Sequence, residues 1–206
     1  MKTPLYFNYS GSRRDLLDRA ITSYEKHAGH LLDIRVNYSV KPRKFTACLN
    51  EILRACSNEK RYFFAHYDSE LESAEPIVKM LEDDSGSALI SWTNITDLLM
   101  LVDVEQVNSV SGWDESFSNS YMEIDLINRL IEVEKTIKVV HPILEGEGLL
   151  HNNASTIRDK NQADNIAYVY GQTLLKDALL YYTRYGKGKD EPLYIEMTEH
   201  VKKHYT

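Results

Sequence analysis

The stretch 62–81, YFFAHYDSELESAEPIVKML, contains an apolar run, an acidic segment and a helical pattern in succession. Tyr62 to His66 has the length and composition of a buried strand, and charge interrupts it from Asp68 to Glu72. Glu75 to Leu81 favours a helix that ends at the polar turn 83–87. This order is typical of domains in which helices cover a mainly parallel sheet.

The same alternation continues on both sides of this stretch. Further strands are expected at Leu5–Tyr9, Leu32–Tyr38, Ala88–Trp92, Leu98–Val102 and Ile137–Val140. Further helices are expected between a Ser12 cap and Gly29, over Phe45–Cys56, and over Tyr121–Val133. The chain is therefore predicted to be an α/β protein with a mostly parallel central sheet flanked by helices.

The sequence changes character after residue 140. Residues 145–148 and 151–153 are expected to form a loop, and a long helical pattern that carries several tyrosines runs from about Ala163 to Tyr185. These tyrosines suit either packing on the sheet domain or a partner surface. Because there is no internal repeat and no low-complexity linker, residues 1–160 are predicted to form the main domain and residues 161–206 a helical C-terminal extension packed on it.

Charge and composition limit the partners. The 206 residues include 31 Asp and Glu against 24 Lys and Arg, and no basic patch reverses the formal net charge of −7, so we expect no nucleic-acid partner. No apolar run approaches the roughly 20 residues of a transmembrane helix, and residues 1–10 lack a signal-peptide pattern. A cytoplasmic location is therefore expected, with Cys48 and Cys56 as reduced core thiols.

Several common catalytic motifs do not occur in the sequence. Neither a glycine-rich phosphate loop of the Rossmann or P-loop type nor a G-x-S-x-G or H-E-x-x-H motif is present. These absences disfavour a Rossmann dehydrogenase, a P-loop kinase, a hydrolase of the nucleophile-elbow type and a metalloprotease.

Asp68 and Glu70 follow the end of the strand at 62–66. Ligands of open α/β sheets bind at the carboxyl ends of strands. Two carboxylates there can hold a hard divalent cation, which can in turn neutralise a diphosphate. A solvated acidic loop that caps the next helix would have the same sequence.

A second acidic constellation follows in GWDESF (112–117) and YMEIDL (121–126). If a helix begins near Tyr121, Glu123 shares one face with Ile127 and Leu130, so Glu123 is expected to point inward and Asp125 elsewhere. The positive end of the helix dipole favours an ionised carboxylate in the first turn, where it can act as a general base. An ordinary first-turn acid is the alternative.

Together, the strand with its D-x-E end, the run LLMLVDVEQVNSVSGWDESF (98–117) and YMEIDL resemble the glycosyltransferases of family 2 and their GT-A-fold relatives. The resemblance covers roughly Pro4 to His151, and Asn50 also lies where that family often has asparagine. The short length is similar to small stand-alone or viral GT-A domains, some of which begin a longer multi-domain protein. A viral member would act in the host cytoplasm.

The resemblance implies a role for each site residue. Asp68 and Glu70 would bind the metal, Mn²⁺ or Mg²⁺, and the diphosphate, with Ser69 between them and His151 as a further metal ligand. Asn8, Tyr9, Ser10 and Asn37 would hold uracil and ribose. Trp113 would stack on an acceptor sugar, Asp114 would accept a hydrogen bond from its hydroxyl, and Glu123 would be the base, with Asp125 the next acidic position of the motif.

The function expected from these residues is metal-dependent transfer of a sugar, of the hexosyl or deoxyhexosyl class, from a UDP-sugar to a hydroxyl of a glycan acceptor. Glu70 and Glu123 stand where the family usually has aspartate, which leaves the stereochemical outcome open. One alternative is a nucleotidyltransferase, and another is a sugar-nucleotide or glycan-binding module without catalysis. The sequence does not determine the oligomeric state.

Overall fold

A computed structural model gives the fold of the chain. The structure describes residues 2–9, 11, 13–38, 44–93, 98–118, 121–140, 148–151, 176–178, 180–181 and 184–185. Its main sheet has six strands, β1 (Thr3–Tyr9), β2 (Leu32–Tyr38), β3 (Arg61–Ala65), β5 (Leu89–Ser91), β6 (Leu99–Asp103) and β7 (Ile137–Val139). Their order is β2-β1-β3-β6-β5-β7. Only the pairings of β6 are antiparallel, which confirms a mostly parallel sheet.

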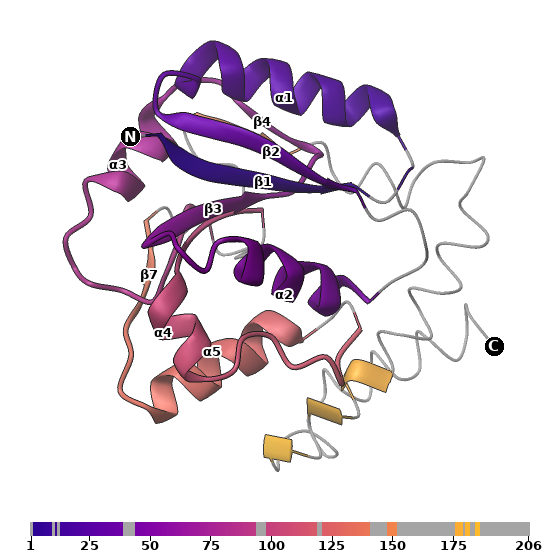
Figure 1. The fold of residues 1–206 in the computed structure, drawn as a ribbon, viewed down its shortest axis with the longest axis vertical. Coiled ribbons are helices and arrows are strands. Elements are labelled where there is room, and N and C mark those ends of the chain that lie inside the picture. Colours follow the sequence, from indigo (N-terminus) through magenta and orange to yellow (C-terminus); the bar gives the residue numbers. More distant parts are fainter. Residues whose placement is uncertain are drawn as a thin grey trace.

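Helices cover both faces of this sheet (Figure 1). The helices α1 (Arg14–Ala28) and α3 (Glu75–Leu81) pack on one face, and α2 (Phe45–Ala55), α4 (Val104–Ser109) and α5 (Met122–Glu132) pack on the other. These bounds agree with the helices expected from apolar spacing, except that the short α4 was not expected. The proposed cap residue Ser12 lies outside the described residues.

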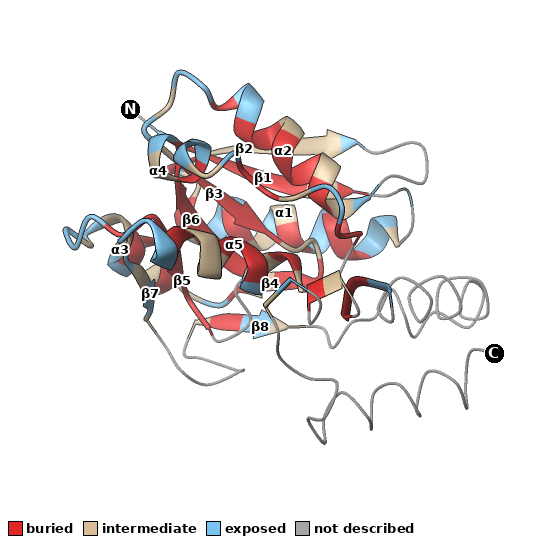
Figure 2. Ribbon diagram, turned by 90° about the horizontal axis from the view of Figure 1, so that it is seen from below, coloured by how far each residue is buried: buried red, intermediate tan, exposed pale blue. Residues whose placement is uncertain are grey.

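The central strands are buried on both sides because their residues alternate between two cores (Figure 2). In β3, Phe63 and Ala65 pack toward α1, whereas Tyr62 and Phe64 pack toward α2 and α5. In β6, Leu101 likewise packs toward α1, whereas its neighbours Met100 and Val102 pack on the α2 and α5 side. A strand that is buried on both faces consists almost entirely of apolar residues, which explains the continuous apolar run at 62–65.

A second, two-stranded sheet lies beside α1. It pairs β4 (Ser69–Leu71) antiparallel with β8 (Leu149–His151), and Ser69 is opposite His151. Neither of these two strands was expected from the sequence. The sequence signal is weak because each strand has three residues, yet Leu71 and Leu149 are buried and join the core under α1.

The described residues of the C-terminal part are helical and pack on the main domain. Ala178 and Tyr181 belong to the core on the α2 and α5 side of the sheet, and Leu180 and Tyr185 contact it. The rest of the helix expected at 163–185 lies outside the described residues, and the division at residue 160 remains a prediction. Within the described ranges, no helix is both long and apolar enough to cross a membrane.

Candidate functional site

Phe45 connects the segments of the two acidic constellations at the edge of the sheet where β1, β2 and β3 end. Asp68 follows β3, and α2 begins at this edge with Phe45. The Phe45 ring lies 5.6 Å from the His66 ring, and its backbone N–H donates to the carbonyl of Ser118 at 2.9 Å. Phe45 therefore joins the end of β3 to the segment that follows GWDE.

Asp68 lies between two histidines. The distance from its Oδ2 to Nε2 of His151 is 3.5 Å, and the distance from its Oδ1 to Nδ1 of His66 is 3.7 Å. Burial by itself would raise the pKa of the Asp68 carboxyl, but the interactions with His151 and His66 outweigh this effect and hold the pKa well below its usual range. Asp68 is thus a buried carboxylate that is held in its ionised form.

Glu70 does not join this group. Its carboxylate pairs with Arg19 of α1 at 2.5 Å, and it lines a surface hollow with α1 residues such as Thr22 and Lys26. Ser69 is fully buried, and its hydroxyl donates to the carbonyl of His66 at 2.6 Å. The Glu70 carboxylate and the Ser69 hydroxyl thus have protein partners, and their roles toward a metal and a nucleotide stay predictions.

Asp68 and His151 provide two suitable ligands for a divalent cation. Their 3.5 Å separation is short enough for both atoms to contact one ion at ligand bonds of about 2.1 Å. Among the described residues, no group of three or more His, Cys, Asp or Glu side chains is arranged to hold a metal. The donor set therefore fits an ion whose remaining ligands come from water and substrate phosphates.

The residues expected to bind the nucleoside lie together at the ends of β1 and β2. Asn8 is in register with Asn37, whose Nδ2 donates to Oδ1 of Asn8 at 3.3 Å. The Tyr9 ring is 6.0 Å from that of Tyr38, which is 56% exposed. Arg14, which the sequence analysis missed, lies over the Tyr9 ring.

Ser10, also expected to bind the nucleoside, lies outside the described residues.

The segment 112–118 runs along α2 because polar side chains of that helix bind its backbone. Oδ1 of Asn50 accepts the N–H of Trp113 at 2.9 Å, and Nδ2 of Asn50 donates to the Trp113 carbonyl at 2.8 Å. The Thr46 hydroxyl donates to the carbonyl of Phe117 at 2.9 Å. Gly112 has a φ of 69°, and a Cβ atom there would lie 2.6 Å from Oδ1 of Asn50, so this close approach requires glycine.

The structure contradicts the expectation that Trp113 offers an open sugar-stacking face. Its side chain is 2% exposed and packs in the core with Leu53 and Leu126 among others. The apolar indole completes the contact between α2 and α5, so burial stabilises it more than exposure would.

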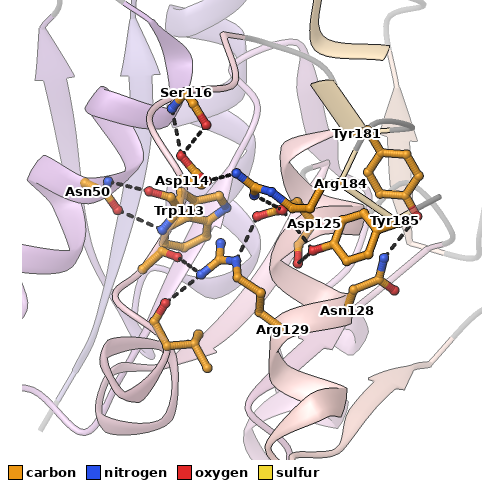
Figure 3. A network of polar contacts seen from close by, with 12 residues as sticks. Asn50, Trp113, Asp114, Ser116, Asp125, Asn128, Arg129, Tyr181, Arg184 and Tyr185 are labelled. Carbon is orange, nitrogen blue, oxygen red and sulfur yellow. Dashed lines mark hydrogen bonds and ion pairs between the residues drawn. The ribbon is translucent and has the colours of Figure 1, made fainter. Parts of the chain in front are cut away.

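Asp114, by contrast, reaches the surface. Its Oδ1 accepts the backbone N–H and the hydroxyl of Ser116 at 2.8 and 2.5 Å, and its Oδ2 pairs with Arg184 at 2.6 Å (Figure 3). Burial raises the pKa of the Asp114 carboxyl, but these hydrogen bonds and the charge of Arg184 lower it to about 2.

The expected orientation of the two acids in α5 is wrong. Asp125 is fully buried, whereas Glu123 is half-buried. Asp125 binds Nε of Arg129 at 2.8 Å, Nη1 of Arg184 at 2.5 Å and the hydroxyl of Tyr185 at 2.9 Å. Helical spacing could not reveal this, because arginine and tyrosine partners, one on the same helix and two far along the chain, make burial of the carboxylate possible.

Besides Arg14, four polar residues with prominent contacts were not predicted from the sequence: His66, Arg129, Asp177 and Arg184. Arg129 lies four residues after Asp125, and this i,i+4 spacing is a signal that could have been used. The Asp177 and Arg184 contacts connect distant parts of the chain, so no local pattern predicts them.

Comparison with known proteins finds no matching family model and no matching curated protein. Solved structures, however, show a similar fold. The catalytic domain of Drosophila β1,4-galactosyltransferase 7 in complex with xylobiose superposes with a TM-score of 0.58 and 14% identity, over 77% of this chain and 73% of that chain. A mutant of that enzyme in complex with manganese, UDP-Gal and xylobiose gives 0.59 and 14%, over 77% and 74%.

A viral protein has a similar fold as well. A glycosyltransferase involved in glycosylation of the major capsid protein of PBCV-1 superposes with a TM-score of 0.54 and 9% identity, over 81% of this chain and all of that chain. These likenesses show that the chain has a GT-A glycosyltransferase-like fold, as the sequence resemblance implied.

Proposed function

We propose that this chain is a metal-dependent glycosyltransferase that transfers a sugar from a nucleoside diphosphate, with a UDP-sugar as the expected donor, to a hydroxyl of a glycan. The observation that carries the proposal is the buried Asp68 carboxylate paired with His151 at the strand edge of a GT-A-like fold. One structural neighbour is a complex with manganese, UDP-Gal and xylobiose, which supports these classes of cation, donor and acceptor.

Each side chain has a proposed part in the reaction. Asp68 and His151 would hold the divalent cation, Mn²⁺ or Mg²⁺, which supplies positive charge against the departing diphosphate. Asn8, Tyr9, Ser10 and Asn37 would bind the nucleoside.

On the acceptor side, Asp114 would accept a hydrogen bond from the acceptor hydroxyl. Glu123 would deprotonate that hydroxyl if the enzyme inverts configuration, and would position the acceptor if it retains. We assign Asp125, which is held by two arginines, a supporting role in place of proton transfer.

The test is release of UDP from a panel of UDP-sugars with Mn²⁺, with and without glycan acceptors. Asp68→Asn should lower the rate at least about 100-fold because it removes the charge that binds the cation. Asp84→Asn, on an exposed turn, is the matched control and should keep the wild-type rate. An Asp68→Asn variant as active as the wild type would refute the metal assignment, and a fully active Glu123→Gln variant would refute the proposed base.

A binding module without catalysis is the second candidate. It is favoured by the ion pair between Glu70 and Arg19, which holds the second acid of the motif away from Asp68. Tight binding of a UDP-sugar without turnover, with acceptors present, would support it. Formation of pyrophosphate from a sugar phosphate and a nucleoside triphosphate would instead identify a nucleotidyltransferase.

A further inference from the structure

The described C-terminal residues contact the end of segment 112–118 and the helix α5 at several points, and these two elements carry the proposed acceptor-side residues. Both Asp177 carboxylate oxygens lie 2.9 Å from the backbone N–H of Ser118. The Tyr181 ring packs 5.3 Å from that of Tyr121, and its hydroxyl accepts a hydrogen bond from Asn128 at 3.0 Å. Arg184 adds two ion pairs, because its guanidinium lies between the carboxylates of Asp114 and Asp125 (Figure 3).

We infer that Arg184, one of the described C-terminal residues 176–178, 180–181 and 184–185, is the positioning residue that holds Asp114 ready to bind an acceptor hydroxyl. This inference rests on the proposed function. It gives a role to a part of the chain that the sequence analysis treated as an extension.

The Arg184 guanidinium is fixed by contacts in several directions. Nη2 binds Oδ2 of Asp114 at 2.6 Å, Nη1 binds Oδ1 of Asp125 at 2.5 Å, and the guanidinium carbon lies 5.3 Å from the centre of the Phe117 ring. A planar fork can bind two carboxylates at once, whereas a lysine ammonium is a single point charge. Arg184 therefore links the exposed Asp114 to the buried Asp125.

Asp114 keeps room for one ligand contact. Its Oδ1 already accepts two hydrogen bonds from Ser116, while its Oδ2 accepts one from Arg184. A carboxylate oxygen has about two lone-pair sites, and the Asp114 side chain is 29% exposed, so Oδ2 can accept another hydrogen bond. As a strongly stabilised anion, Asp114 would bind a hydroxyl without removing its proton.

The local charge indicates which acceptors fit. Arg184 is paired with Asp114 and Asp125, Arg129 is paired with Asp125, and the Lys44 ammonium donates to the carbonyl of Glu115, so these cations already have partners. An anionic glycan would therefore gain little attraction from them. A neutral glycan that offers a hydroxyl to Asp114 is the acceptor class that this surface fits.

Three variants separate positioning from general stability. Arg184→Met removes the link to Asp114. Tyr185→Phe removes only the hydrogen bond to Asp125, so it loosens the same helical residues without touching Asp114. Arg54→Met, at an exposed position in the last turn of α2, removes one positive charge elsewhere.

The measurements are the donor KM, the acceptor KM with neutral glycans such as xylobiose and with a glycan that contains a uronic acid, and UDP binding with Mn²⁺. Arg184→Met should raise the acceptor KM about tenfold or more and leave UDP binding within about twofold, and Arg184→Lys should recover only part of the loss. Tyr185→Phe and Arg54→Met should keep the wild-type acceptor KM.

Equal effects of Arg184→Met and Tyr185→Phe on the acceptor KM, or a wild-type preference for the acidic glycan, would overturn the inference. If no UDP-sugar is turned over, the proposed function fails, and titration of the UDP complex with xylobiose by NMR tests the inference instead. Binding that is weakened by Arg184→Met would support it, and no glycan binding to the wild type would refute it.

Discussion

Replacing Asn50 with alanine should destabilise the protein by about 3 kcal/mol. The change leaves the buried backbone N–H and carbonyl of Trp113 without the partners that they have at 2.9 and 2.8 Å. Each orphaned group costs about 1–3 kcal/mol, and the better helix propensity of alanine returns roughly 0.6 kcal/mol. For a domain of this size, the expected loss corresponds to a fall in Tm of roughly 6–12 °C. Urea and thermal unfolding measure both quantities.

Asn128→Ala is the matched control for this prediction. Asn128 also lies on a helix, but among the described residues its amide has a single hydrogen-bond partner, the Tyr181 hydroxyl at 3.0 Å, in a partly buried position. Loss of that bond costs about 1 kcal/mol, and the gain in helix propensity offsets much of it. If Asn50→Ala destabilised the protein no more than Asn128→Ala, the backbone of Trp113 would not depend on the Asn50 amide, and the account of segment 112–118 would be refuted.

Three further predictions follow from the site. Gly112→Ala should cost at least about 2 kcal/mol of unfolding free energy, since its φ is 69° and the new Cβ would lie 2.6 Å from Oδ1 of Asn50; a variant of wild-type stability would contradict this steric argument. Burial opposes ionisation of Asp114, but its hydrogen bonds, that from Arg184 included, lower its pKa to about 2, so its stabilising contribution is present above about pH 4 and is lost as the pH falls toward 2. Asp114→Asn should therefore flatten the loss of stability across that window in urea unfolding, and an unchanged slope would argue against the ionised pair. His151→Gln should weaken Mn²⁺-dependent binding of UDP roughly tenfold or more, as measured by titration with Mn²⁺, whereas equal affinity would exclude this histidine from the metal site.

The main sheet could be predicted because its strands and helices have clear periodicities. β3 and β6 are buried on both faces and consist of apolar runs, and α2 buries a regular stripe that includes Leu49 and Leu53. Asp68 follows directly from this arrangement, since a carboxylate just after a parallel strand must lie at the ligand-binding edge of the sheet.

The contacts of the site could not be predicted with the same rules. β4 and β8 are three-residue strands far apart in the chain, and only their pairing brings His151 next to Asp68. The burial of Asp125 depends on Arg184 from a distant segment, so helical spacing alone assigned the inward position to Glu123 instead. Ion pairs between distant residues leave no trace in local periodicity.

The pairing of β4 with β8 also affects the order in which the protein becomes competent to bind its ligand. β1 to β3 pair through connections of moderate length, whereas the pairing of Ser69 with His151 closes a chain segment that includes β5, β6 and β7. Closure of long chain segments is entropically costly and tends to occur late in folding. A chain that has formed its central sheet therefore still lacks half of the Asp68 and His151 pair. Because Leu71 and Leu149 belong to the core under α1, closure of this small sheet and completion of that core are expected to occur together.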